Sequence, residues 1–149
     1  MSLRAITPDD LPELFEHQHD PAGAAMAGMP IREEADFYAH RTKVEADPSI
    51  ETRAIIVDGE LAGDTVSYVD DSGRHVGYRI AQRFWGRGVA TAALRLFLAE
   101  LPDRPLHADL LKTNIGSRRV LEKCGFRLLG PEELPEDADP DSFYMRLDS

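Results

Sequence analysis

The feature of this sequence that most constrains the fold is a strand-like run followed by a turn with two glycines and an amphipathic helix. The strand-like run is His75 to Ile80, and the turn is Trp85-Gly86-Arg87-Gly88-Val89-Ala90. Apolar residues then recur every three or four positions until Pro102, as on one face of a helix: Val89, Ala93, Leu94, Phe97, Leu98 and Leu101. Glycines at the start of a helix leave backbone N–H groups unobstructed at the positive end of the helix dipole. The pattern therefore predicts an anion site that suits a phosphate or a pyrophosphate.

Two common phosphate-binding motifs do not match this turn. A dinucleotide-binding fold needs a third glycine at the position of Thr91. A P-loop ends in Gly-Lys-Ser or Gly-Lys-Thr, and the corresponding residues here are Val89, Ala90 and Thr91. The antiparallel strands expected before the turn suit neither fold. A third alternative is that the two glycines serve only tight packing between strand and helix.

Charge is distributed unevenly along the chain, whose net charge is −10. From Arg83 to Arg127 there are nine Lys or Arg residues and four Asp or Glu residues, so this basic segment carries +5 and the rest of the chain −15. A basic segment in an acidic chain favours a local anionic ligand, the alternative being a chance excess of solvated charges, and the overall acidity argues against wrapping a nucleic acid. Arg87 in the turn, together with Arg83 and one of Arg118 or Arg119, is a candidate for contacts with phosphate oxygens.

Length and composition are typical of one soluble domain, residues 1–149. No stretch approaches the roughly 18 consecutive apolar residues of a membrane helix, and no apolar run follows a basic start at the N-terminus, so we expect a cytoplasmic protein that does not contact membranes. The single cysteine, Cys124, excludes an internal disulfide and a multi-cysteine zinc site. Its apolar neighbours indicate a packed thiol, and no metal is expected.

The remaining elements alternate between strands and helices. Strands are expected at 3–7, 52–57, 61–69, 75–80, 105–111, 126–129 and 143–147, and helices at 7–19, 32–46, 89–101 and 114–124. Residues 21–30 have the composition of a mobile connection, and residues 130–142 contain three prolines and several acids, as in a loop. This order predicts an antiparallel three-strand meander followed by a β-turn-α-β-α-β segment with parallel pairing, in a layered α/β (α+β) fold.

Two motifs carry a resemblance to a known family. The first is Gly77-Tyr78-Arg79-Ile80 with Trp85-Gly86-Arg87-Gly88-Val89-Ala90-Thr91, and the second is Asn114-x-x-Ser117-Arg118-Arg119-Val120-Leu121-Glu122-Lys123-Cys124-Gly125-Phe126. With both in this order, the chain resembles the GNAT superfamily of acyl-CoA-dependent N-acyltransferases, and within it the ribosomal-protein N-terminal acetyltransferase branch. The resemblance implies a central mixed sheet of about seven strands, splayed into a V and flanked by about four helices. Acetyl-CoA would lie in this V as the cosubstrate.

The resemblance also implies which residues hold acetyl-CoA. Backbone N–H groups of the turn would cradle the pyrophosphate, from Trp85, Gly86, Arg87, Gly88, Val89, Ala90 and Thr91. Arg79 and Ile80 would pair with the pantetheine arm like an extra strand, and Asn114 would donate a hydrogen bond to or accept one from the same arm. The basic segment would then have an anionic ligand.

Aminolysis of a thioester needs a neutral amine, a polarised carbonyl group and a proton for the leaving thiolate. By resemblance, the backbone N–H of Ile80 polarises the carbonyl group and Ser117 donates the proton to the sulfur. The alternative for Ser117 is a solvated or capping serine in the first turn of a helix. The wider superfamily often has a tyrosine seven residues after the asparagine as the proton donor, and this chain has Leu121 there. Trp85 also departs from the family pattern, in which Gln or Arg commonly begins the turn. Ala92 departs from it too, because this branch often has Glu at that position.

The base that takes the proton from the amine has several candidates. His75 lies on the strand leading to the site, and histidine is a common general base. Glu33 and Glu34 start the helix that usually lines the acceptor pocket in this family. A chain of water molecules is an alternative to a single base.

The acidic remainder of the chain, including the loop from Glu132 to Asp141, would attract a cationic amine acceptor. A peptide N-terminus, a polyamine, an aminoglycoside or another small amine fits this charge, although a solvated loop without a binding role is an alternative. We expect a monomer or a homodimer, the latter pairing through an exposed strand 143–147. The alternative function is a non-catalytic acyl-CoA-binding sensor or interaction module with the same fold.

Overall fold

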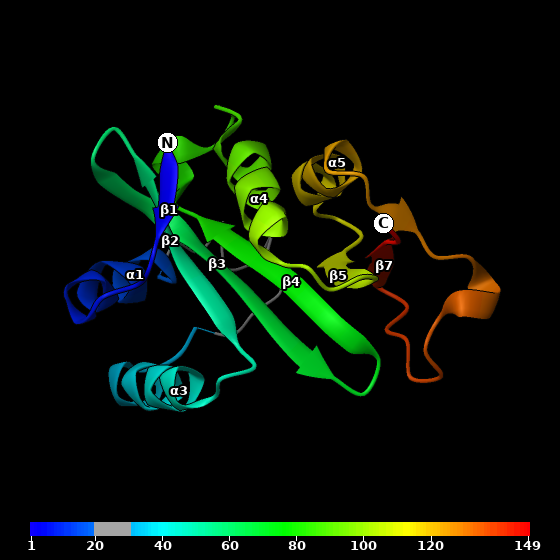
Figure 1. Ribbon diagram of the computed structural model, residues 1–149, viewed down its shortest axis with the longest axis horizontal. Coiled ribbons are helices and arrows are strands. Elements are labelled where there is room, and N and C mark those ends of the chain that lie inside the picture. The colour runs from blue at the N-terminus through cyan, green and yellow to red at the C-terminus, as the bar shows by residue number, and fades with distance from the viewer. Residues whose placement is uncertain (20–30) are drawn as a thin grey trace.

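A computed structural model of the protein describes residues 1–19 and 31–149 (Figure 1). Within these residues seven strands form one mixed sheet in the order β1-β2-β3-β4-β5-β7-β6. The strands are β1 Ser2–Arg4, β2 Glu51–Val57, β3 Glu60–Asp70, β4 Gly73–Ile80, β5 Leu106–Leu111, β6 Arg127–Leu128 and β7 Ser142–Leu147. The helices are α1 Leu11–His17, α3 Glu34–Ala46, α4 Val89–Glu100 and α5 Ile115–Lys123. The connection expected at 21–30 lies outside the described residues.

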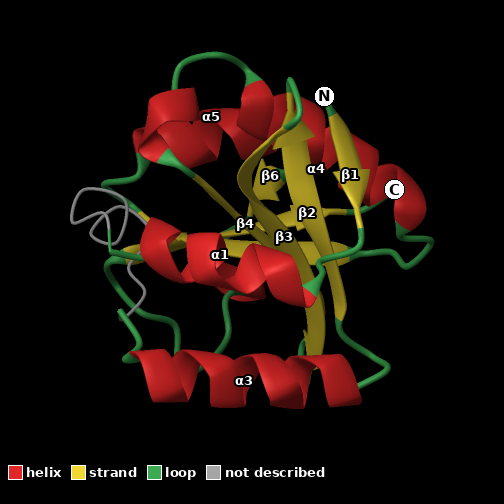
Figure 2. Ribbon diagram, turned by 90° about the vertical axis from the view of Figure 1, so that its left-hand side faces the viewer, coloured by secondary structure: helices red, strands yellow, loops and turns green. Residues whose placement is uncertain are grey.

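The helices cover both faces of the sheet (Figure 2). α4 and α5 lie on one face, where Leu94 and Phe97 of α4 are fully buried against Leu106 of β5 and Met145 of β7. α1 and α3 lie on the other face, where Leu11 and Leu14 of α1 pack with Ala54 and Leu61, a core flanked by Phe37 of α3. The layered fold expected from the sequence is confirmed. Within the described ranges, no helix is both long and apolar enough to cross a bilayer.

The expected antiparallel meander is formed by β2, β3 and β4. Asp58 and Gly59 make the turn between β2 and β3 with φ of 51° and 80°, the left-handed conformation that Asp-Gly turns of hairpins adopt. β4 then pairs in parallel with β5, but only through Arg74 with Leu106 and His75 with His107. Beyond His75 the two strands diverge, so the sheet is splayed between β4 and β5.

The two ends of the chain differ from the sequence-based expectation. The first strand ends at Arg4, and the expected helix 7–19 begins as a 3-10 turn, Pro8–Asp10, before α1. β7 lies between β5 and β6 and is paired on both sides, so the expectation of an exposed strand 143–147 that pairs across a dimer is wrong. β6 is antiparallel to β7, because the long loop after β6 returns the chain into the gap beside β5.

Asp10 fastens the first strand to the first helix. Its carboxylate accepts hydrogen bonds from the Arg4 guanidinium at 2.7 and 2.8 Å and from the Thr7 backbone N–H at 2.8 Å. The Arg4 hydrogen bond is the main cause that lowers the pKa of Asp10 from 3.8 to about 2. A carboxyl group whose pKa falls on folding stabilises the protein above its unfolded-state pKa.

We therefore predict that Asp10→Asn lowers the free energy of unfolding at pH 7 by about 1–2 kcal/mol, because the half-exposed Arg4 leaves the pair partly screened by water. The difference from the wild type should shrink as the pH falls from about 4 towards 2, where Asp10 becomes protonated in the folded state. Urea unfolding at a series of pH values measures it. Asp9→Asn, at an exposed neighbour, is the control, and an equal loss in both variants would contradict the prediction.

Candidate active site

The end of β4 has one edge free of strand pairing within the described part of the chain. The N–H of Ala81 donates to the Ala62 carbonyl on β3 at 2.8 Å. Backbone groups of neighbouring residues point to opposite sides of a strand, so the N–H of Ile80 points away from β3, into the gap between β4 and β5. On the β3 side the contact is close, because a Cβ on Gly63 would overlap the carbonyl group of Arg79. The Val76–Ile80 edge can therefore pair with an extended ligand.

The predicted turn follows directly from this edge. Gly86 and Gly88 have φ of 73° and 74°, and Gly88 is the N-cap residue of α4. A Cβ built on either glycine meets no atom within 4 Å, so packing against the sheet does not explain why the two glycines are needed. The left-handed conformation and the open space beside it are typical of a backbone cradle for an anion.

Trp85, at the first position of the turn, has a structural role that the sequence did not indicate. Its indole Nε1–H donates to the Ile80 carbonyl at 2.9 Å. This hydrogen bond ties the turn to the end of β4. It thereby fixes the distance between the free strand edge and the glycines.

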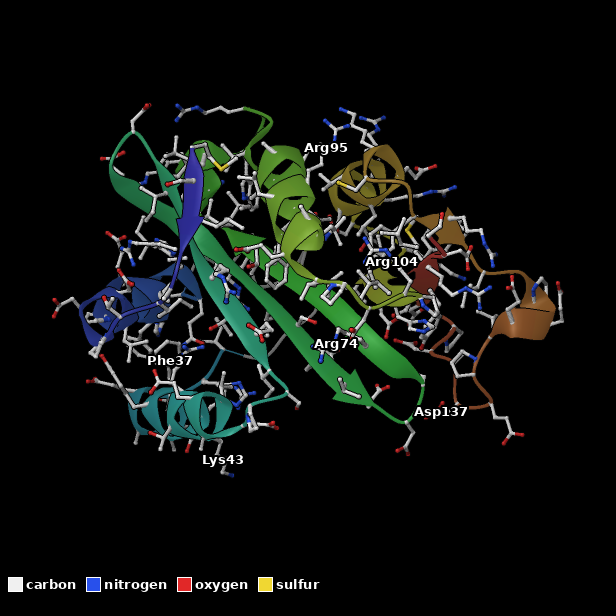
Figure 3. All side chains as sticks on the ribbon, in the orientation of Figure 1. Phe37, Lys43, Arg74, Arg95, Arg104 and Asp137 are labelled. Carbon is white, nitrogen blue, oxygen red and sulfur yellow. The ribbon has the colours of Figure 1, made fainter. Side chains whose placement is uncertain are left out.

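The arginines of the basic segment divide into two groups. Arg83 and Arg87 both lie over the Phe84 ring, at 4.8 and 5.2 Å from its centroid, next to the turn. Arg118 instead lies over the Phe143 ring at 5.0 Å and pairs with Glu122 at 3.4 Å. Arg95 lies between α4 and α5, where it donates to the carbonyl group of Lys123 at 3.2 Å (Figure 3). Part of the positive charge read from the sequence therefore holds the two helices together.

Ser117 lies on α5, where its hydroxyl group meets the side chain of Tyr78 on β4. The Tyr78 hydroxyl donates to Ser117 Oγ at 2.9 Å, and burial raises the pKa of Tyr78 above 10.0, so the phenol stays protonated at neutral pH. Asn114 accepts a hydrogen bond from the Ser117 backbone N–H at 3.1 Å and thereby caps α5. The two sequence motifs thus meet across the splay, joined by a pair of hydroxyl groups. The contact expected between Asn114 and the pantetheine arm stays a prediction.

The candidate bases named from the sequence lie elsewhere. His75 is at the end of β4 where β5 is still paired, and its Nε2 contacts Asp70 at 3.0 Å and Ser72 at 2.9 Å. Glu33 and Glu34 are exposed at the start of α3. Cys124 is half-buried, and burial raises the pKa of its thiol above 9.0, which agrees with a packed residue. Among residues 1–19 and 31–149, no group of three His, Cys, Asp or Glu is placed to hold a metal ion.

A pocket of about 490 Å³ adjoins the end of β4 on the α1 side of the sheet. Its lining comes from two segments: Glu13, Glu16, His17 and His19 in and after α1, and Ala81, Gln82 and Arg83 after β4. The sequence could not reveal this pocket, because more than sixty positions separate the two segments and no motif includes the α1 residues.

A free strand edge, a glycine turn at a helix N-terminus and a hydroxyl pair across the gap define a site for an extended ligand with a phosphate end, as in acyl-CoA-dependent transferases. A family model described as the acetyltransferase (GNAT) domain matches residues 1–127, and the chain belongs to this family. The resemblance stated from the two motifs is thereby confirmed at family level. No curated protein sequence matches the chain.

Solved structures share the fold at low identity. The aminoglycoside acetyltransferase AAC(6')-Ib in complex with coenzyme A superposes with a TM-score of 0.81 at 23% identity, over 99% of this chain and 94% of that one. An acetyltransferase from Agrobacterium tumefaciens str. C58 gives 0.79 at 19%, over 99% and 90%. A spermidine N-acetyltransferase SpeG chimera from Vibrio cholerae and hSSAT gives 0.79 at 17%, over 99% and 94%.

Proposed function

We propose that residues 1–149 form a single acetyltransferase domain that moves an acetyl group from acetyl-CoA directly to a primary amine. The observation that carries this proposal is the free Val76–Ile80 edge, which leads into the open Gly86–Gly88 turn. The edge suits the amide groups of a pantetheine arm, and the turn suits the pyrophosphate. The names of similar structures, which mention coenzyme A, support the same cosubstrate.

The geometry supports specific roles for three residues. The Ile80 N–H points into the gap between β4 and β5, where it can polarise the thioester carbonyl group. Ser117 Oγ accepts a hydrogen bond from the Tyr78 hydroxyl group, which leaves its own hydroxyl hydrogen free to go to the leaving sulfur. Tyr78 can then pass its proton to Ser117, and solvent reprotonates Tyr78. The chain thus compensates for Leu121, which cannot act as the proton donor.

The proposed acceptor is a cationic amine, either a small molecule or a peptide N-terminus. The names of similar structures include an aminoglycoside and a spermidine acetyltransferase, which supports a cationic amine. The acidic loop is a weaker argument, because Glu133 in it is already paired with Arg127 and Arg146. The ribosomal-protein branch, a cytoplasmic location and a monomer or homodimer stay predictions from the sequence.

The test is release of free thiol from acetyl-CoA by the purified protein, with spermidine, kanamycin and a short peptide with a free N-terminus as acceptors. We expect release that depends on one of these amines and an acetylated amine of matching amount by mass spectrometry. Binding of acetyl-CoA without amine-dependent release would favour the alternative, a non-catalytic acyl-CoA sensor with the same fold.

A further inference from the structure

His17 is the last residue of α1 and lines the pocket beside the end of β4. Its side chain is only 10% exposed, although histidine carries two polar ring nitrogens. The ring Nδ1 is buried and has no hydrogen-bond partner among the described residues. The other nitrogen, Nε2, is 4.0 Å from the Glu13 carboxylate. A buried histidine with so little support from its surroundings is costly unless it serves a ligand.

The charges around His17 keep the ring neutral. Burial is the main cause that lowers its pKa below 6.5, and the positive charges of Arg83 and Arg79 on the β4 side act in the same direction. Glu13, on the same helix as His17, acts in the opposite direction. Glu16 and His19 are the other titratable residues of the pocket. At neutral pH the ring therefore has one nitrogen lone pair available for a proton.

The pocket extends from His17 to the end of β4, where the transfer is proposed. Ala81, which shares the pocket with His17, directly follows Ile80. Ile80 is the residue whose N–H points into the gap between β4 and β5. Glu13 and Glu16 give the same pocket a negative side, which attracts a cationic amine. Arg83 also lines the pocket, and its guanidinium group donates to the Leu61 carbonyl at 3.4 Å and lies over the Phe84 ring.

We propose that His17 is the general base of the reaction and that the acceptor amine binds in the pocket between α1 and the end of β4. The inference rests on the function proposed above. The amine nitrogen uses its lone pair to form the bond to the acetyl carbon, and the carbon–sulfur bond breaks with its electron pair going to sulfur. One proton passes from the amine nitrogen to Nε2 of His17, whose Nδ1 keeps the hydrogen of the neutral ring. A second proton passes from Ser117 to sulfur, Ser117 regains a proton from Tyr78, and solvent reprotonates Tyr78. The imidazolium formed at His17 is stabilised by Glu13, and solvent then removes its proton.

The experiment compares His17→Gln with the wild type in the thiol-release assay, with an amine of known pKa so that its own ionisation can be divided out. We expect kcat/KM for the amine to fall about 100-fold, with the dissociation constant of acetyl-CoA unchanged. The wild-type profile should fall at acidic pH with a pKa below 6.5, because only the neutral ring accepts a proton, and the variant should lack that limb. Added imidazole should restore part of the rate of the variant.

His40→Gln is the matched control, because His40 is an exposed histidine on α3, outside the pocket; it should keep the wild-type rate and profile. Glu13→Gln provides a second test that does not disturb the buried ring. Loss of this carboxylate should move the acidic limb to lower pH, since Glu13 raises the pKa of His17. If the wild type is active but the acidic limb stays in place in Glu13→Gln, or if His17→Gln keeps the wild-type rate, the role of His17 is overturned and the proposed function is not. A wild type that binds acetyl-CoA and acetylates no amine would overturn the proposed function and this inference with it.

Discussion

Replacing Gly88 by tryptophan is expected to abolish the stabilisation of the protein by CoA. Gly88 has a φ of 74° and open space at the position of a Cβ, so an indole there would fill the proposed pyrophosphate site. For the wild type, CoA at 100 times its dissociation constant should add about 2.7 kcal/mol. For a chain of this length that corresponds to a rise in melting temperature of roughly 5–10 °C. Thermal unfolding with and without CoA measures both proteins.

Gly59→Trp is the matched control for backbone strain. Gly59 also has a left-handed conformation, with a φ of 80°, and also has open space around it, but it lies in the hairpin between β2 and β3. Both variants should lose stability from the strained backbone. Only the Gly88 variant should also lose the response to CoA. A full response in Gly88→Trp would place the phosphate site outside the turn.

The second large effect is expected from the hydroxyl pair. Ser117→Ala should lower kcat by about 100-fold, because the leaving sulfur would lose its proton donor. Tyr78→Phe should have a smaller effect, because the Ser117 hydroxyl group remains but is no longer oriented by the 2.9 Å hydrogen bond. The double variant should be little worse than Ser117→Ala, since residues that act as one unit are not additive. Single-turnover kinetics at saturating acetyl-CoA measure all three.

Tyr144→Phe is the control for loss of a tyrosine hydroxyl group that bonds within the protein, because the Tyr144 hydroxyl accepts a hydrogen bond from the backbone N–H of Asp139 in the loop before β7. It should keep the wild-type kcat. If Tyr78→Phe were the more damaging variant and Ser117→Ala nearly neutral, Tyr78 itself would be the proton donor to sulfur. The two single variants and the double variant together therefore show which of the two hydroxyl groups contacts the substrate.

The sequence was informative where local chemistry determines structure. Gly86 and Gly88 could be assigned to a turn before the helix, because their left-handed conformations are a local requirement of that turn. The meander was predictable because Asp58-Gly59 is a local hairpin signal. The start of α5 was predictable from Asn114, whose side chain caps the helix.

The sequence was uninformative where residues meet only through the tertiary fold. The proposed role of His17 could not be inferred from the sequence, because nothing near it in the sequence shows that Ala81 shares its pocket. His75 was chosen as a candidate base because it precedes Ile80 on the same strand. The two residues are five positions apart on the extended strand β4, which places them at different points along it. The expectation of an exposed strand 143–147 was wrong, because strand order depends on the path of the loop from 129 to 141 and not on the residue pattern of the strand.

The position of β7 has a consequence for the synthesis of the protein. β5 forms one wall of the splay, and it is held along its whole length by β7, from Leu106 with Leu147 to Leu111 with Ser142. A nascent chain that has already made both glycines and Ser117 therefore still lacks the strand that supports this wall. Completion of the proposed cosubstrate site waits until residues 142–147 have been synthesised and have paired with β5, and a chain truncated before Ser142 lacks this support.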